Sequence, residues 1–134
     1  MREQLVAAAI EAMRNAYAPY SRYQVGAALL TKAGKIYTGC NIENAAYGPT
    51  NCAERTAFFK AVSEGERQFS AIAVVGGAEG IIRDFAPPCG VCRQVMREFC
   101  ADDFEIHLWD GSSCRTCTLA ELLPLSFGSG NLKE

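Results

Sequence analysis

Three cysteines of this sequence have the residue type and the spacing of metal ligands. Cys89 and Cys92 stand three positions apart, and 36 residues separate Cys52 from Cys89. Soft thiolates suit zinc, which binds four ligands in a tetrahedron. A site with three protein ligands keeps its fourth position for water, and zinc lowers the pKa of that water toward neutrality. The spacing therefore predicts a catalytic Zn²⁺ site formed by Cys52, Cys89 and Cys92.

Glu54 and Arg55 lie beside the first of these cysteines. A carboxylate at Glu54 could move protons to and from a metal-bound water without binding the metal. Residues two apart on a regular helix diverge by about 200°, so we expect Cys52 at the very start of a helix. Three thiolates carry more negative charge than one Zn²⁺ ion neutralises. The partial positive charges of two helix N-termini would offset part of this excess negative charge. We predict that Arg55 is oriented by the site and contacts a thiolate, rather than pointing to solvent as a surface residue.

These side chains must be positioned by the elements that carry them. Pro19 is expected to end the first helix, Thr50 or Asn51 to cap the second, and Gly76-Gly77 to end the third strand. Strands that alternate with helices favour parallel pairing. The prediction is an α/β fold, a three-layer α-β-α sandwich with a central mixed five-stranded sheet, formed by residues 1–134 as a single domain. Its helices are expected at residues 4–17, 52–64, 89–100 and 119–123, and its strands at 24–31, 35–40, 70–75, 104–109 and 114–118.

The composition of the chain argues against some kinds of binding partner. The chain has 134 residues, of which 49% are hydrophobic and 21% charged, and its formal net charge is -2. This balance is typical of a globular domain and argues against tight binding of a nucleic-acid backbone. We find no apolar run near the roughly 20 residues of a membrane span. Seven cysteines, an odd number, favour metal binding or chemistry in a reducing compartment, so we predict a cytoplasmic protein without nucleic-acid or membrane partners.

Five motifs taken together identify a family that the sequence resembles. They are Cys52-Ala53-Glu54, Pro88 to Gln94 (Pro-Cys-Gly-Val-Cys-Arg-Gln), Pro19-Tyr20-Ser21, Val25 to Leu29, and Asn41 to Gly48. With them the chain resembles the zinc-dependent cytidine deaminases over nearly its whole length. Cysteine stands where other deaminases carry histidine, which places the sequence with the short, homotetrameric, all-cysteine branch.

The resemblance implies a role for each matching residue. Glu54 would take a proton from the zinc-bound water, deliver it to N3 of the pyrimidine and later protonate the leaving ammonia. Asn41 and Glu43 would hold the ribose hydroxyl, since an amide and a carboxylate supply donors and acceptors for it. Further substrate contacts are implied for Tyr23 beside the ring, where the family usually has phenylalanine, and for the backbone at Ala53.

Two more implications concern the surroundings of the site. Gln94 would join Arg55 around the metal ligands. Phe127 would reach into the active site of a neighbouring subunit, so that a homotetramer shares its sites between subunits. The implied reaction is the hydrolytic deamination of cytidine and deoxycytidine to uridine and deoxyuridine, with release of ammonia. A nucleoside antibiotic such as blasticidin S is the alternative substrate, although the Asn41 and Glu43 pair favours a nucleoside with a free ribose hydroxyl.

Two alternatives from other functional classes stay open at this point. Cys114 and Cys117 form a second Cys-x-x-Cys pair, which with Cys89 and Cys92 could make a structural four-cysteine zinc module without catalysis. That hypothesis leaves Glu54 unexplained. A thiol-redox function of Cys89 and Cys92 is the other alternative, because thiols at helix N-termini have lowered pKa values.

Several residues also have ordinary structural explanations. Asn41 and Glu43 could be plain turn or edge residues. We expect Cys40 and Cys100 to be buried as small hydrophobic side chains. His107, the single histidine, is expected to pack within a strand with its polar atoms satisfied rather than to act in catalysis.

Overall fold

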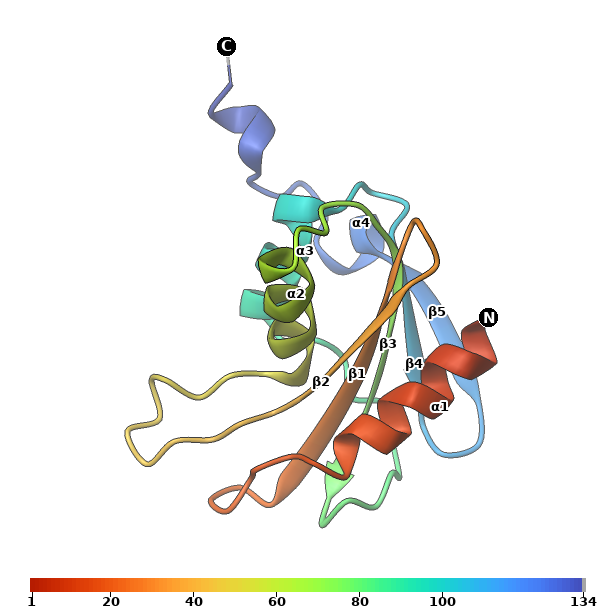
Figure 1. Ribbon diagram of the computed structural model, residues 1–134, viewed down its shortest axis with the longest axis vertical. Coiled ribbons are helices and arrows are strands. Elements are labelled where there is room, and N and C mark those ends of the chain that lie inside the picture. The colour runs from red at the N-terminus through yellow and green to blue at the C-terminus, as the bar shows by residue number, and fades with distance from the viewer. Residues whose placement is uncertain (134) are drawn as a thin grey trace.

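Five strands form one mixed sheet with helices on both faces, as predicted (Figure 1). The computed structural model describes residues 1–133. The strand order is β2-β1-β3-β4-β5, and β3 with β4 is the parallel pair. The elements, in chain order, are α1 (Arg2–Met13), β1 (Tyr23–Thr31), β2 (Ile36–Cys40), α2 (Ala53–Ser63), β3 (Phe69–Ala78), α3 (Gly90–Phe99), β4 (Glu105–Trp109), β5 (Cys114–Thr118), α4 (Leu119–Leu122) and η1 (Ser129–Asn131).

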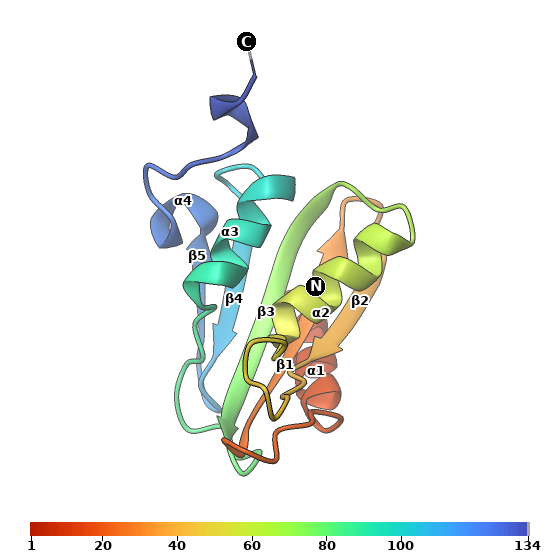
Figure 2. The same cartoon turned by 90° about the vertical axis from the view of Figure 1, so that its left-hand side faces the viewer.

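Alternation along the strands divides the apolar core into two layers. Successive strand residues point to opposite faces of a sheet. Ala28, Ala73 and Val75 therefore pack on one face under α1, whereas Leu29 and Val74 join the core on the other face. Figure 2 shows α2 and α3 side by side on that second face, with α1 behind the sheet. The result is the expected three-layer sandwich, and it places α2 and α3, which begin next to the predicted ligands, on the same side.

Two predicted element ends were wrong because tertiary pairing decides them. The first helix ends at Met13, not near Pro19. Tyr17, which was expected on its apolar stripe, is 55% exposed and pairs through its backbone with Ile42. The third strand runs through Gly76-Gly77 to Ala78, because both glycines pair with β1. A side chain at Gly77 would collide with the main chain of Ile81, so glycine here permits close approach rather than a turn.

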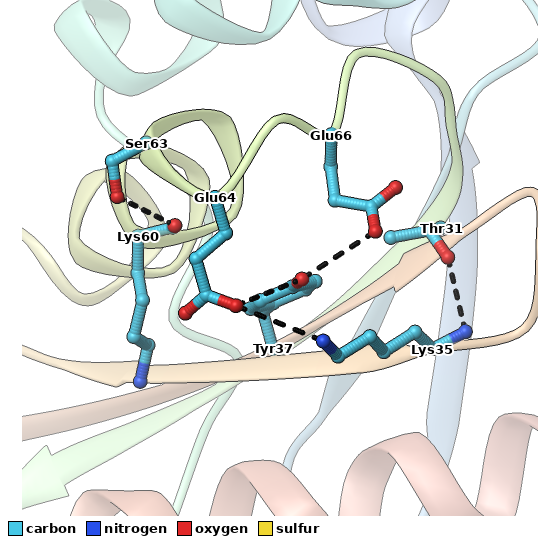
Figure 3. A network of polar contacts seen from close by, with 7 residues as sticks. All are labelled: Thr31, Lys35, Tyr37, Lys60, Ser63, Glu64 and Glu66. Atoms are coloured by element: carbon cyan, nitrogen blue, oxygen red, sulfur yellow. Dashed lines mark hydrogen bonds and ion pairs between the residues drawn. The ribbon is translucent and has the colours of Figure 1, made fainter.

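A polar network holds the C-terminal end of α2 against β2 (Figure 3). The Tyr37 hydroxyl shares its one proton between carboxylate oxygens of Glu64 and Glu66, at 3.3 and 3.4 Å, and Lys35 Nζ lies 3.7 Å from Glu64. Lys35 Nζ also sits 4.8 Å from the centre of the Tyr37 ring. These contacts anchor one end of α2, while its first turn carries the predicted chemistry.

Gly39 sets how closely α2 packs on β2. A Cβ at this position would lie 2.5 Å from the Ala53 carbonyl oxygen and 2.6 Å from the Ala57 nitrogen. Because these are backbone atoms, Gly39→Ala must push the helix away. We expect this variant to lower the free energy of unfolding by about 1–3 kcal/mol, measured by urea denaturation. Gly130→Ala is the matched control, since its added Cβ meets nothing within 4 Å; equal stabilities of the two variants would contradict the prediction.

Candidate active site

The sulfur atoms of Cys52, Cys89 and Cys92 converge at the starts of α2 and α3. Cys52 Sγ lies 3.8 Å from Cys89 Sγ, which lies 3.5 Å from Cys92 Sγ, and all three lie within 4.8 Å of one another. Sulfur ligands 2.3 Å from a tetrahedral zinc ion are about 3.8 Å apart. The donor set and its spacing therefore fit zinc. Within residues 1–133 this is the one cluster of three or more potential metal ligands, and it excludes Cys114 and Cys117.

Both helices present their N-terminal ends to this cluster. Cys52 is the residue preceding α2 and Cys89 the residue preceding α3, and both have extended backbone conformations. The chain thus bends into each helix at a sulfur ligand, which meets the geometric requirement set by Glu54. The positive ends of two helix dipoles lie beside the thiolates and favour their negative charge. Thr50 and Asn51 do not cap α2; the Asn51 amide instead donates to the Thr56 hydroxyl at 3.2 Å.

Glu54 is a carboxyl group buried beside the sulfur cluster. It lies in the first turn of α2 and is only 4% exposed. Burial, and to a smaller extent the neighbouring charge of Cys52, raise the pKa of Glu54 to about 7. Among the sulfurs, a hydrogen bond from Cys92 lowers the pKa of Cys52 to about 5, with Arg55 contributing, and the same bond raises the pKa of Cys92. The site therefore combines an anionic sulfur cluster with a carboxyl group kept out of water.

Arg55 points to the site, as expected. Its Nη2 donates to Cys52 Sγ at 3.3 Å. Its Nε is buried and finds no hydrogen-bond partner in the part of the chain that the structure describes. A guanidinium held this way neutralises part of the thiolate charge and fixes the orientation of the sulfur.

Removing this guanidinium should weaken metal binding. We expect Arg55→Ala to lower zinc affinity about 10–100-fold, the usual range for loss of a residue that orients a ligand. Competition with a chromophoric chelator measures this affinity. Arg14→Ala is the control, because Arg14 pairs with Glu11 on the exposed side of α1. Unchanged zinc affinity in Arg55→Ala would show that the guanidinium does not support the ligand.

The residues predicted to hold the sugar form a second, hydrogen-bonded group. The Asn41 side chain is bound to β1 through both its polar atoms: its amide donates to the Tyr23 carbonyl at 2.8 Å, and its oxygen accepts from the Val25 amide at 2.9 Å. The Glu43 carboxylate accepts from the backbone amides of Tyr20 and Ser21 and from the Ser21 hydroxyl. Asn41, Glu43 and Tyr23 are thus linked through the start of β1.

The remaining predicted residues lie in different surroundings. Ala53 is fully buried at the start of α2. The Gln94 side-chain amide donates to the Phe127 carbonyl, not to a sulfur of the cluster: the distance from Nε2 to the carbonyl oxygen is 2.9 Å. This hydrogen bond links the C-terminal tail to α3. Phe127 is 60% exposed, on a tail that leads away from the sheet (Figure 1).

Ser21 is a residue that sequence analysis did not single out. It entered only as part of the motif Pro19-Tyr20-Ser21, yet its hydroxyl bonds to Glu43, 22 positions further along the chain. The available signal was a serine one residue after a tyrosine in a turn, which predicts local hydrogen bonds but no distant partner.

The other cysteines and the histidine lie apart from the cluster. Cys100 is buried as expected, and burial raises the pKa of its thiol to about 12. The same expectation was wrong for Cys40, which is only half-buried at the end of edge strand β2. Cys114 and Cys117 belong to strand β5 at the sheet edge. His107 is buried with Nδ1 2.8 Å from the Thr116 hydroxyl, which confirms a packing role with a satisfied polar atom. Within residues 1–133, no helix combines the length and apolar character needed to cross a bilayer.

The sequence features of one protein family extend over most of the chain. This family, described as the cytidine and deoxycytidylate deaminase zinc-binding region, matches residues 1–108. The chain belongs to the cytidine and deoxycytidylate deaminase family. Its match includes Cys52, Glu54, Cys89 and Cys92.

Individual relatives agree with this family. The chain is 51% identical over 131 residues to a cytidine deaminase of Sporosarcina psychrophila, covering 97% of this chain and 93% of that protein. It is 50% identical over 134 residues to a cytidine deaminase of Halalkalibacterium halodurans, covering 99% of this chain and 98% of that protein. A blasticidin-S deaminase of Bacillus cereus is more distant, at 33% identity over 111 residues, covering 80% of this chain and 79% of that protein.

A solved structure supports the same conclusion. The crystal structure of cytidine deaminase from Burkholderia pseudomallei matches with a TM-score of 0.87 and 46% identity, over 95% of this chain and 99% of that chain. These similarities make the chain an enzyme of the cytidine deaminase family, rather than a structural zinc module or a thiol oxidoreductase.

Proposed function

We propose that the protein hydrolyses cytidine and deoxycytidine to uridine and deoxyuridine, with release of ammonia. The observation that carries this proposal is the convergence of three cysteine sulfurs next to a buried glutamate. Relatives that are named cytidine deaminases and are about 50% identical to this chain in sequence support the substrate class. The protein would act in the cytoplasm, where its seven free cysteines would stay reduced.

The metal-binding part of the proposal assigns zinc to the sulfur cluster. Cys52, Cys89 and Cys92 would hold Zn²⁺, with Arg55 supporting Cys52. When bound, zinc polarises water and lowers its pKa, so that a nucleophile is supplied near neutral pH. The helix N-termini beside the thiolates would moderate the negative charge that three such ligands bring to the ion.

Glu54 would move the protons of the reaction. Its carboxylate would accept a proton from the attacking water and deliver it to N3 of the pyrimidine, which makes C4 more electrophilic. It would then take the proton of the new C4 hydroxyl and pass it to the amino group, which leaves as ammonia as the C4–N bond breaks and the C4 carbonyl forms. Burial of this side chain supports the role, since a carboxyl group shielded from bulk water exchanges its proton with the substrate rather than with solvent.

The neighbouring residues would bind and orient the nucleoside. Asn41 and Glu43 would hold the ribose hydroxyl, Tyr23 would lie beside the pyrimidine, and the backbone at Ala53 would face the base. The hydrogen bonds that tie Asn41 to β1 support this proposal, because a rigid amide binds a hydroxyl at a smaller entropic cost.

The oligomeric part of the proposal concerns the C-terminal tail. The chain would form a homotetramer in which Phe127 contributes to a neighbouring active site. The exposed Leu125, Phe127 and Leu132 support this, because apolar side chains gathered on a projecting tail are typical of an interface. Sedimentation of the purified protein tests it, and a monomeric mass would refute it.

One experiment tests the reaction directly. Purified protein is analysed for zinc per chain and assayed for ammonia released from cytidine, deoxycytidine and blasticidin S. We expect about one zinc per chain and turnover of both pyrimidine nucleosides. The more distant blasticidin-S deaminase makes that antibiotic the second candidate substrate; its exclusive turnover would overturn the proposed specificity.

A further inference from the structure

The Glu43 carboxylate is held by three hydrogen bonds from one short turn. Its Oε1 accepts from the backbone amides of Tyr20 at 2.9 Å and Ser21 at 3.1 Å, and its Oε2 accepts from the Ser21 hydroxyl. The backbone amide of Tyr23 in turn donates to Ser21 Oγ at 3.0 Å. A hydroxyl has a single proton. With its oxygen accepting from Tyr23, Ser21 directs that proton to Glu43.

The backbone of Glu43 is fixed without help from Ser21. Its amide donates to the Tyr17 carbonyl at 2.8 Å, and the Tyr17 amide donates to Asn41 at 3.0 Å. Ile42 exchanges two hydrogen bonds of 2.9 Å with Asn51, the residue before Cys52. The segment of residues 41–43 is therefore tied to the chain that leads into the metal cluster. Ser21 acts on a different degree of freedom, the rotation of the Glu43 carboxylate.

The two carboxylate oxygens are used unequally. A carboxylate oxygen can accept two hydrogen bonds. Within residues 1–133, Oε1 accepts two and Oε2 accepts one, so Oε2 keeps capacity for a further donor. Glu43 and Ser21 line a cavity of about 380 Å³, together with Tyr20, Asn44, Tyr47 and Thr50. The Ser21 hydroxyl and the two amides also lower the pKa of Glu43, which keeps the carboxylate ionised as an acceptor.

We propose that Ser21 is a positioning residue for nucleoside recognition: its hydroxyl, itself held by the Tyr23 amide, turns the Glu43 carboxylate so that Oε2 accepts from a sugar hydroxyl. This inference rests on the proposed function, in which Glu43 contacts the ribose. The hydroxyl concerned is the one at C3′, the ring hydroxyl that cytidine and deoxycytidine share. The Ser21 hydroxyl is bonded to Glu43 and to the Tyr23 amide and is not part of the sulfur cluster, so its removal should affect binding rather than the chemical step.

The test compares two substrates that differ only in this hydroxyl, deoxycytidine and 2′,3′-dideoxycytidine. For Ser21→Ala we expect KM for deoxycytidine to rise about tenfold, the usual scale for loss of a hydrogen bond to a charged group. We expect kcat to stay within about twofold, and KM for the dideoxy substrate to change by less than about twofold. Ser21→Thr, which keeps the hydroxyl, should restore most of the affinity. Calorimetric binding of deoxyuridine and 2′,3′-dideoxyuridine should show the same pattern without turnover.

Controls separate this role from a general effect on folding. Ser63→Ala removes a hydroxyl that donates to the Lys60 carbonyl at 2.8 Å near the end of α2, and it should leave both KM values unchanged. Equal losses for both substrates in Ser21→Ala, or no loss for either, would overturn the role of Ser21 while leaving the proposed function intact. A wild-type protein that releases no ammonia from deoxycytidine would overturn the proposed function itself, and the inference with it.

Discussion

Glu54→Ala is expected to lower kcat by at least 10²–10⁴-fold while the protein stays folded and keeps its zinc. A single general acid–base step contributes an effect of about this size, and Glu54 is proposed to act twice in one turnover. Its carboxyl group is not among the three potential ligands of the sulfur cluster, so its removal should leave zinc bound. Ammonia release measures turnover, metal analysis measures zinc per chain, and thermal unfolding measures stability.

Two companion variants sharpen this experiment. Glu54→Gln keeps the shape of the side chain but cannot transfer a proton, so it should be as inactive as Glu54→Ala. Because burial of a carboxylate is unfavourable and Glu54 is almost fully buried, we expect Glu54→Gln to unfold at the same or a higher temperature than the wild type. Glu98→Ala, on the exposed side of α3, is the control for loss of a carboxylate. Near-normal turnover in Glu54→Gln would refute the proposed mechanism.

Cys89→Ser should reduce bound zinc from about one ion per chain to nearly none and abolish deamination. Cys89 Sγ lies close to both other sulfurs, 3.8 Å from Cys52 Sγ and 3.5 Å from Cys92 Sγ. A serine hydroxyl stays protonated at neutral pH and is a poor substitute for a soft thiolate. Metal analysis after dialysis against a chelator gives the zinc content, and ammonia release gives the activity.

The second cysteine pair provides the matched control for this experiment. Cys114→Ser combined with Cys117→Ser should leave zinc bound, because β5 is not part of the sulfur cluster. Cys117 is buried, so some loss of stability is expected in this variant and is measured separately. Zinc retained in Cys89→Ser, or lost from the Cys114 and Cys117 variant, would contradict the proposed ligand set.

The two largest predictions concern separate tasks of one site, proton transfer by Glu54 at the start of α2 and metal binding by Cys89 before α3. Cys52 precedes α2 in an extended conformation, and Glu54 occupies the first turn of that helix. The bend between them lets residues two positions apart face the same site. The packing of α2 on Gly39 and the anchoring of its far end by Tyr37 and Glu64 hold this turn in place. Because Glu54 lies at this site without being one of the three clustered sulfurs, loss of proton transfer should be separable from loss of zinc.

Local chemistry in the sequence was enough to predict the centre of the site. Thiolate spacing at expected helix starts predicted that Cys52, Cys89 and Cys92 come together, as their sulfurs do, and the requirement that Glu54 face the same site predicted that Cys52 lies at the very start of its helix. Helix and strand periodicity predicted the α/β sandwich with its mixed sheet. These features depend on residues near one another in the chain, or on alternation within one element, and such patterns are visible in a sequence.

Contacts between distant segments were decided only by the tertiary structure. The first helix stops at Met13 because Tyr17 pairs with Ile42, and the third strand continues through Gly76-Gly77 because β1 accompanies it. Ser21 reaches Glu43, and Gln94 holds Phe127 rather than a ligand sulfur. In each case a backbone or side-chain polar group is satisfied by a partner more than 20 residues away. Neither periodicity nor local spacing carries information about such a partner, because it becomes a neighbour only when the sheet and helices have packed.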